Sequence, residues 1–159
     1  MNQNKVIIYT DGSCDVNPGG NGGYAAIIFD NNKPIKLSGY EPNTTNQRME
    51  MLAVISSLNY FKEKKSITLF TDSAYVCNGY NQKWYNNWKR NGWKNSKGED
   101  VANKDLWLRI IEAVEFHDVK MIHVKGHADN IFNNECDIMA KDIVSFYKKI
   151  DKIMDKYIE

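Results

Sequence analysis

Two acidic residues end similar apolar runs in the first half of the chain. The segments IYTDGS (8–13) and LFTDSA (69–74) both pass through apolar residues to Thr-Asp and then to a small residue. If the two segments are neighbouring parallel strands, the carboxylates of Asp11 and Asp72 emerge at the edge of the sheet where α/β folds bind ligands. An Asp that merely starts a turn is the alternative for either residue alone, but it is weaker for the matched pair.

A third acid lies on an apolar helix face. Glu50 shares a stripe with Val54, Leu58 and Phe61 at helical spacing. A carboxylate on a face that packs into the core costs free energy unless it is paired or bound to a metal ion. The alternative is a glutamate at the edge of the helix that pairs with Arg48 or with a lysine.

Asp137 stands near the start of the last predicted helix. A helix capped by Asn134 would place this acid at the third helical position, where it meets amide donors and the helix dipole, and that alone would explain it. If Asp137 instead converges with the other three acids, at least one of the four must have a raised pKa. Hard divalent cations relieve such crowding, because carboxylate oxygens suit Mg²⁺ or Mn²⁺ rather than zinc. Two such ions can activate a water and stabilise the leaving oxygen in phosphodiester cleavage.

Hydrophobic patterning places these acids on an α/β scaffold. Strands are expected at 6–10, 24–29 and 35–41, joined by turns rich in Gly and Asn, so the chain opens with an antiparallel three-stranded meander. The elements expected after it are a helix from a cap at Thr44 or Thr45 to about Phe61, a strand at 67–71, an interrupted helix at 74–90, a helix at 103–116, a strand at 120–124 and a helix from Asn134. This order predicts an α/β fold with a mixed five-stranded sheet, the meander plus two parallel strands, flanked by helices.

Length and composition predict a single domain over residues 1–159. The chain is 42% hydrophobic and 26% charged, which excludes a disordered protein and a small disulfide scaffold. Its first residues contain no long apolar run behind a basic start, so we expect no signal peptide, no membrane span and a cytoplasmic protein. Cys14, Cys77 and Cys136 have no CxxC spacing, which is typical of reduced thiols and offers no zinc site.

A basic, aromatic segment covers residues 83–98. Taken alone, the net charge of +1 argues against a polyanionic partner. The charges are unevenly distributed, however: this segment has five basic residues and no acid, whereas residues 99–159 carry nine basic against thirteen acidic residues. Three of the four tryptophans, Trp84, Trp88 and Trp93, lie in the same segment. Interleaved cations and flat rings suit a nucleic-acid backbone. The alternative is a small satellite core with solvating lysines; we assign Trp88 and Trp93 to shaping the segment and Trp84 to a substrate face.

Six ordered motifs resemble those of bacterial-type (type 1) ribonuclease H. They are YTDGS followed by NPGG, then TTNQRMEM, FTDSAYV, NNWKRNGWK, NKDLW and VKGHADNIFNNECD, and they cover nearly the whole chain. The resemblance implies a ribonuclease H-like fold in which residues 83–98 form a basic protrusion. It implies an endonuclease that hydrolyses the RNA strand of RNA–DNA hybrids and leaves 5′-phosphate and 3′-hydroxyl ends. Two Mg²⁺ ions, for which Mn²⁺ can substitute, are the implied cofactors, and we expect a monomer without an obligate protein partner.

The resemblance carries metal-binding roles onto the four acids. Asp11 would bridge both ions, Asp137 would hold the ion that activates water, and Glu50 with Asp72 would hold the ion facing the leaving 3′-oxygen. All four are therefore predicted to be catalytic.

His127 is the fifth residue that the resemblance implies to be catalytic. It matches a loop histidine that assists proton transfer or product departure, and an imidazole with an ordinary pKa suits a proton carrier. The commonest loop of the family has glycine where this chain has Asp129, which we expect to stiffen the loop and to add a negative charge beside His127. His117 and His123 have no such support, and we interpret them as structural.

The resemblance also implies residues that bind the hybrid. The 2′-hydroxyl distinguishes the RNA strand, and the implied residues that read it are Gly12, Cys14, Asn17, Asn46 and Gln47. Thr45 and Asn87 match positions that bind a DNA phosphate, and the basic protrusion, with Lys89, Arg90 and Lys94, is implied to grip the DNA strand; Trp84 is our own candidate for the substrate face. Asn17 precedes Pro18, so turn chemistry is its alternative, and the glycines at 19–23 favour a hairpin turn because GK[ST] is absent.

Three other functions compete with cleavage of hybrids. A hybrid-binding module without catalysis requires a defective site, but no acid is missing. A DNA-acting nuclease or transposase-like relative would share the fold and the carboxylates, and the complete set of predicted 2′-hydroxyl contacts argues against it. A phosphatase fits worse, because Asp11 is not followed by the Asp-x-Asp pattern.

An apolar stripe continues to the end of the chain. Ile143, Tyr147, Ile150, Met154 and Tyr157 follow one another at spacings of three and four residues. The stripe predicts a long last helix that packs on the domain; a surface for a partner is the alternative.

Overall fold

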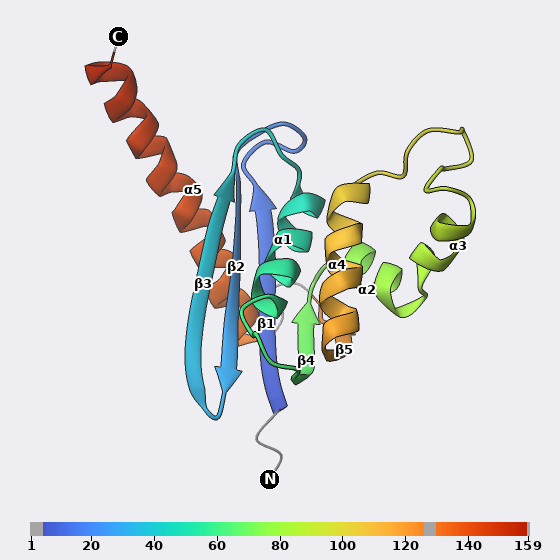
Figure 1. Ribbon diagram of the computed structural model, residues 1–159. Helices are drawn as coiled ribbons and strands as arrows, with labels where there is room; N and C mark the ends of the chain where they lie inside the picture. The colour runs from blue at the N-terminus through green and yellow to red at the C-terminus, as the bar shows by residue number, and fades with distance from the viewer. Residues whose placement is uncertain (1–4, 126–129, 159) are drawn as a thin grey trace.

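A mixed five-stranded sheet forms the centre of the molecule (Figure 1). The computed structural model describes residues 5–125 and 130–158. Three strands, β1 (Lys5–Cys14), β2 (Gly22–Asp30) and β3 (Lys33–Glu41), form the antiparallel meander, and β4 (Ser66–Thr71) and β5 (Asp118–His123) continue the sheet in parallel to β1. The strand order β3-β2-β1-β4-β5 confirms the predicted sheet.

Helices cover both faces of this sheet. Figure 1 shows α1 (Asn46–Leu58) and α4 (Lys104–Phe116) on one face and α5 (Ile131–Tyr157) on the other. The short helices α2 (Ala74–Asn81) and α3 (Trp84–Arg90) lie beyond β4 and β5. Most of α1 is buried between β1, β2 and α4, so the helix that carries Glu50 is held firmly against the sheet.

Two predicted helix boundaries are wrong. The first helix ends at Leu58, three residues before Phe61, although the Phe61 side chain is still buried. The last helix begins at Ile131, because the side chain of Asn130 caps it by accepting hydrogen bonds from the backbone N–H groups of residues 132 and 133. Asn134 therefore lies inside the helix, and Asp137 is in its second turn rather than at the third position.

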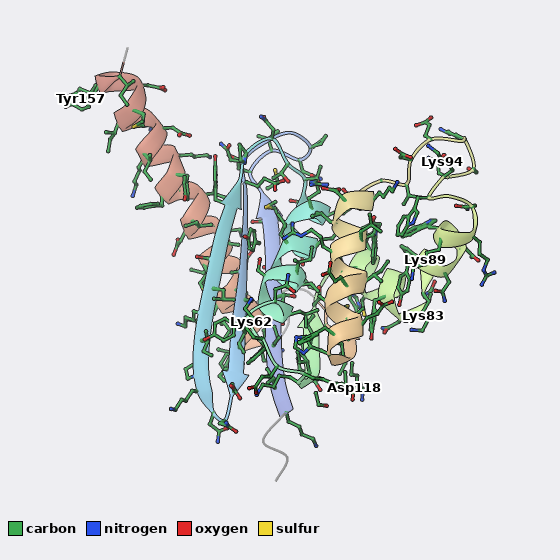
Figure 2. The ribbon with its side chains drawn as sticks, viewed as in Figure 1. Lys62, Lys83, Lys89, Lys94, Asp118 and Tyr157 are labelled. Atoms are coloured by element: carbon green, nitrogen blue, oxygen red, sulfur yellow. The ribbon has the colours of Figure 1, made fainter. Side chains whose placement is uncertain are left out.

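The tryptophans of the basic protrusion pack together. The ring centroid of Trp88 lies 5.5 Å from that of Trp107 on α4, 5.6 Å from Trp93 and 6.2 Å from Trp84. Trp107 is fully buried and joins this cluster to the main core. Packing thus fixes the protrusion on the body of the protein, and Figure 2 shows Lys83, Lys89 and Lys94 distributed over it.

α5 packs tightly against the sheet at Gly23 of β2. A Cβ atom at this position would lie 2.0 Å from the backbone oxygen of Ala140 and 2.7 Å from Cγ2 of Ile143. Only glycine leaves room for the helix backbone here, so Gly23 sets the distance between α5 and the sheet.

The far end of α5 extends past the sheet (Figure 1). Its side chains at Ile153, Met154 and Tyr157 are exposed, and Figure 2 shows Tyr157 well away from the sheet. The prediction that the stripe packs on the domain along its whole length is therefore wrong beyond residue 150. Among residues 5–125 and 130–158, no helix combines the length and apolarity that a membrane crossing requires.

Substituting Gly23→Ala is expected to lower the free energy of unfolding by about 1 to 3 kcal/mol, because the added methyl group must push α5 off the sheet. Urea unfolding measures this change. Ser145→Ala, at an exposed position of the same helix, is the control and should have almost no effect. A Gly23→Ala protein as stable as the wild type would contradict the close approach.

Candidate active site

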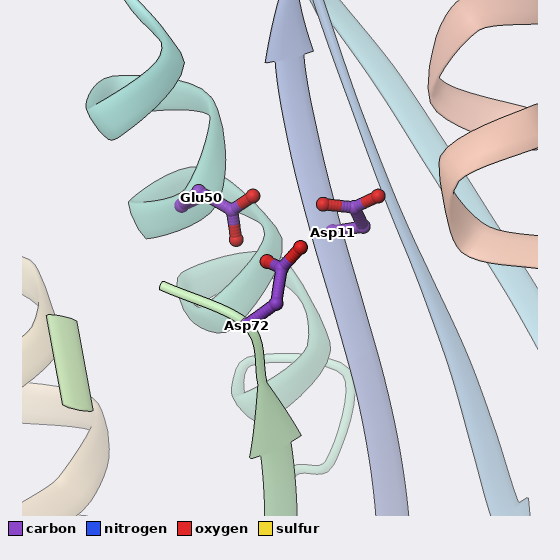
Figure 3. Close-up of side chains that lie close together, drawn as sticks. All are labelled: Asp11, Glu50 and Asp72. Atoms are coloured by element: carbon purple, nitrogen blue, oxygen red, sulfur yellow. The ribbon is translucent and has the colours of Figure 1, made fainter. Parts of the chain in front are cut away.

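Three carboxylates meet beyond the end of β4, beside the neighbouring strand β1 (Figure 3). Asp11 lies in β1, Asp72 follows β4 directly and Glu50 extends from α1, and a carboxylate oxygen of each lies within 4.8 Å of one from the other two. The parallel pairing of β1 with β4 sets Tyr9 opposite Phe70, so the two Thr-Asp sequences end at the same edge. The structure thus brings together the two matched runs, as predicted, and adds Glu50 to them.

Gly12 brings Glu50 close to Asp11. A Cβ atom on Gly12 would lie 2.4 Å from the carbonyl carbon of Met49 and 2.5 Å from the nitrogen of Glu50, so only glycine lets α1 approach β1 here. The backbone N–H of Gly12 donates to both carboxylates, at 2.9 Å to Oδ1 of Asp11 and at 2.9 Å to Oε1 of Glu50. The same backbone N–H therefore donates to the carboxylates of both Asp11 and Glu50.

Burial and crowding raise the pKa of both acids. Asp11 is 5% exposed and Glu50 is 7% exposed. Burial, with the nearby charges of Asp72 and Asp137, raises the pKa of Asp11 from its ordinary 3.8 to about 7. The pKa of Glu50 is raised well above its ordinary value, first by burial and then by its contact with Asp11. The alternative of a glutamate at the helix edge that pairs with Arg48 or with a lysine is wrong: Glu50 is buried, Arg48 forms its ion pairs with Asp105 and Glu41, and no cation pairs with Glu50 among the described residues.

Asp137 lies in the same cavity but apart from the compact trio. All four acids line a cavity of 540 Å³. The carboxylate of Asp137 forms an ion pair with Lys141 one turn later on α5, at 2.9 Å. Because α5 begins at Ile131, a position in the first helical turn does not explain this acid.

The donor set fits a hard divalent cation. Among the described residues, Oε2 of Glu50 is buried and has no hydrogen-bond partner. A buried carboxylate oxygen without a donor is costly, and a cation beside it would supply the missing contact. Asp11, Glu50 and Asp72 offer only oxygen ligands, which favours Mg²⁺ or Mn²⁺ over zinc.

Most of the residues predicted to read RNA surround this cavity. Gly12, Cys14, Asn46 and Gln47 line it. The N–H of Cys14 donates to Oδ1 of Asn46 at 2.7 Å, and the N–H of Asn46 donates to Oδ1 of Asn17 at 3.0 Å. Asn17 is outside the cavity lining but is tied by this bond to the start of α1.

Thr45 and the residues of the protrusion lie outside the cavity lining. Thr45 caps α1 by accepting a hydrogen bond from the N–H of Arg48 at 3.1 Å. Trp84 is half-buried, and its Nε1 donates to Oε1 of Gln82 at 2.9 Å.

The four polar residues predicted on the protrusion are all exposed. Asn87, Lys89 and Arg90 lie on α3, and Lys94 forms an ion pair with Asp100 at 2.8 Å. They are a second surface, separate from the acidic cavity.

His127, which is predicted to be catalytic, lies outside the described residues, so its role stays a prediction.

One residue of the site was missed by the sequence analysis. Lys141 lines the acidic cavity and was not predicted; its signal in the sequence is its position four residues after Asp137, a spacing that favours ion pairs on helices.

The raised pKa values predict how stability without metal depends on pH. Between about pH 4 and about pH 7 the folded protein binds more protons at Asp11 and Glu50 than the unfolded chain does, so the free energy of unfolding falls as pH rises through this window. Asp11→Asn removes one charge and should stabilise the metal-free protein at pH 7.5 by about 1 to 3 kcal/mol. Urea unfolding in chelator at pH 5 and pH 7.5 measures both effects, with Asp142→Asn as the exposed control. A destabilised Asp11→Asn protein at pH 7.5 would count against the crowding.

Known proteins resemble this chain over most of its length. A family model described as RNase H matches residues 3–145. Ribonuclease H of Acetivibrio thermocellus is 47% identical over 138 residues, which are 87% of this chain and 93% of that protein. Ribonuclease H of Caldicellulosiruptor saccharolyticus is 45% identical over 140 residues, 88% of this chain and 96% of that protein.

Solved structures agree with these relatives. LC9-RNase H1, described as a type 1 RNase H with the type 2 active-site motif, superposes with a TM-score of 0.79 at 26% identity, over 91% of this chain and 74% of that one. LC11-RNase H1 in complex with an RNA/DNA hybrid has a TM-score of 0.69 at 19% identity, over 89% of this chain and 98% of that one, and shares the fold. The acidic cluster, the sheet order and the sequence identity lead to one conclusion: the chain belongs to the ribonuclease H family.

Proposed function

We propose that this chain is an endonuclease that hydrolyses the RNA strand of RNA–DNA hybrids and leaves 5′-phosphate and 3′-hydroxyl ends. Relatives with 45–47% identity are named ribonuclease H. The observation that carries the proposal is the cluster of Asp11, Glu50 and Asp72, in which a buried oxygen of Glu50 has no partner among the described residues. Such a cluster suits metal-assisted cleavage of a phosphodiester.

Membership in this family implies the use of a divalent metal ion. We infer that the metal is Mg²⁺, with two ions per site and with Mn²⁺ able to substitute, because all the candidate ligands are carboxylates. When bound, these ions supply an activated water and neutralise charge on the leaving oxygen.

The protein's own residues prepare the cavity for this chemistry. Asp11 accepts a hydrogen bond from the N–H of Gly12, and the nearby charges of Asp72 and Asp137 help to raise its pKa. Glu50 and Asp72 are the ligands expected on the leaving-group side, and Asp137 is the ligand expected on the side of the attacking water. Lys141 neutralises part of the charge of Asp137.

Selection of the RNA strand depends on the polar rim of the cavity. Asn46 and Gln47 at the start of α1, with the main chain of Gly12 and Cys14, are placed beside the carboxylates, where they can contact a 2′-hydroxyl next to the scissile phosphate. Asn17 supports this rim through its hydrogen bond to the N–H of Asn46.

The basic protrusion is the expected contact for the DNA strand. Its exposed cations, Lys89, Arg90 and Lys94, can approach phosphates, while the tryptophan cluster beneath keeps them in place. Thr45 and Asn87 are the further phosphate contacts that we infer. Trp84, our candidate for the substrate face, is half-buried and packs on Tyr75, Trp88 and Trp107.

Neither alternative function is favoured. A binding module without catalysis does not need four acids in one cavity, two of which, Asp11 and Glu50, are buried and have raised pKa values. A nuclease acting on DNA would gain nothing from a polar rim that reads a 2′-hydroxyl.

The proposed cytoplasmic location rests on the sequence alone.

Cleavage of labelled duplexes tests the proposal. In Mg²⁺ the wild-type protein should cut the RNA strand of a hybrid and leave double-stranded RNA and double-stranded DNA intact, and chelator should stop the reaction. Asp11→Asn should reduce the rate by at least about 1,000-fold, because the metal ligand is lost, while affinity for the hybrid stays within about threefold. Asp142→Asn is the matched control and should keep full activity. Cleavage of double-stranded DNA, or full activity of Asp11→Asn, would refute the assignment.

A further inference from the structure

The part of α5 that follows the family match contacts a loop beside the active site. The match to the family model ends at residue 145, whereas α5 continues to Tyr157. Tyr147 and Lys148 are the first contacts beyond that point, and both reach toward the connection between β1 and β2, residues 15–21. This loop also carries Asn17.

Tyr147 holds the loop through an aromatic stack. Its ring lies on Tyr40 of β3, with the ring centroids 4.2 Å apart and the planes 8° apart. The hydroxyl of Tyr40 donates to Oδ1 of Asn21 at 2.8 Å. The backbone of Asn21 in turn pairs with Asp15 on the other side of the loop, so the stack supports the base of the loop.

Lys148 holds the same loop through an ion pair. Its Nζ lies 2.8 Å from Oδ2 of Asp15, while Oδ1 of Asp15 accepts the N–H of Asn21 at 2.7 Å. The hydrogen bond from Lys148 lowers the pKa of Asp15. Both carboxylate oxygens of Asp15 are therefore engaged, one within the loop and one with α5.

The loop is joined directly to the rim of the cavity. Gly19 N–H donates to the Thr44 carbonyl at 2.8 Å, and Thr44 N–H donates to the Gly20 carbonyl at 3.0 Å. Asn17 accepts from the N–H of Asn46, whose own side chain accepts from the N–H of Cys14. A displacement of the loop would thus move Asn17 relative to Asn46.

Gly23 sets the distance between α5 and the sheet, and the contacts of Tyr147 and Lys148 depend on this distance. Tyr40 is the cross-strand partner of Gly23, and Ala140 of α5 lies directly against Gly23. Tyr147 follows Ala140 by seven residues, which places it two turns further along the same helix face. The close approach at Gly23 therefore brings the Tyr147 ring onto Tyr40.

We propose that Tyr147 and Lys148 are positioning residues, which hold the 15–21 loop so that Asn17 and Asn46 meet the RNA strand. This inference rests on the proposed function. The contacts of Asn17 and Asn46 with the RNA strand form in the enzyme–substrate complex as well as in the transition state. Loss of the two side chains should therefore raise KM and leave kcat nearly unchanged.

Steady-state cleavage of the hybrid tests this role. The double variant Tyr147→Ala with Lys148→Met should raise KM about fivefold to tenfold, the combined effect expected for one aromatic stack and one partly exposed ion pair, with kcat within about twofold of the wild type. Tyr147→Phe with Lys148→Arg keeps the stack and the charge and should restore the wild-type KM. Lys152→Ala, one turn beyond Lys148 on the exposed end of α5, is the control and should change neither constant.

Two further measurements separate positioning from a general loss of stability. Asp15→Asn breaks the ion pair with Lys148 by changing the loop residue and leaves α5 unsubstituted. It should therefore raise KM about two- to threefold without lowering kcat. In the Asp11→Asn background, the double variant should weaken affinity for the hybrid but not for a DNA duplex. An unchanged KM, equal loss of affinity for both duplexes, or a fall in kcat that follows the fall in Tm would overturn the inference. A wild-type protein that fails to cleave hybrids would refute the proposed function instead, and the two affinities would still decide the role of the loop.

Discussion

Two buried carboxylates that share one backbone amide are the constraint on which the rest of this structure depends. Asp11 and Glu50 both accept the N–H of Gly12, in a position where burial already opposes their ionisation. Such an arrangement is stable only if protons or cations compensate the charge. Burial and crowding raise the pKa of both acids, which favours protons as the compensation without metal, and Oε2 of Glu50, which has no partner among the described residues, is placed to contact a cation instead.

Close backbone packing is what forces the carboxylates together. Gly12 lets α1 lie against β1, and Gly23 lets α5 lie against β2, so each glycine sets one helix at a distance that a larger residue would prevent. The first contact places Glu50 beside Asp11. The second sets α5, and with it Asp137, over the same edge of the sheet, and it carries Tyr147 onto Tyr40. Close packing of the backbone therefore fixes the site, and Asp11 and Glu50 are held by the backbone N–H of Gly12, whereas Asp137 is paired with the side chain of Lys141.

Local patterns predicted much of this arrangement, but not the contacts between distant segments. The repeated Thr-Asp runs predicted that Asp11 and Asp72 would meet, because strand periodicity is a local property. The apolar stripe placed Glu50 on the core-facing side of its helix but left a glutamate at the helix edge as the alternative, and only the packing of α1 against β1 decides between them. The start of α5 was predicted too late in the chain, because Asn130 rather than Asn134 caps the helix by accepting the N–H groups of residues 132 and 133. The ion pair of Lys148 with Asp15 joins residues that are far apart in the chain and leaves no local signal.

Proton release on metal binding tests the central claim most directly. If Asp11 and Glu50 hold protons at neutral pH because they are crowded, a cation that binds them must displace a proton. Titration calorimetry with Mg²⁺ at pH 6.5, in two buffers with different ionisation enthalpies, counts the protons released. We predict about one proton per site for the wild type, and markedly fewer for Asp11→Asn. Binding of Mg²⁺ with no proton release would contradict the account.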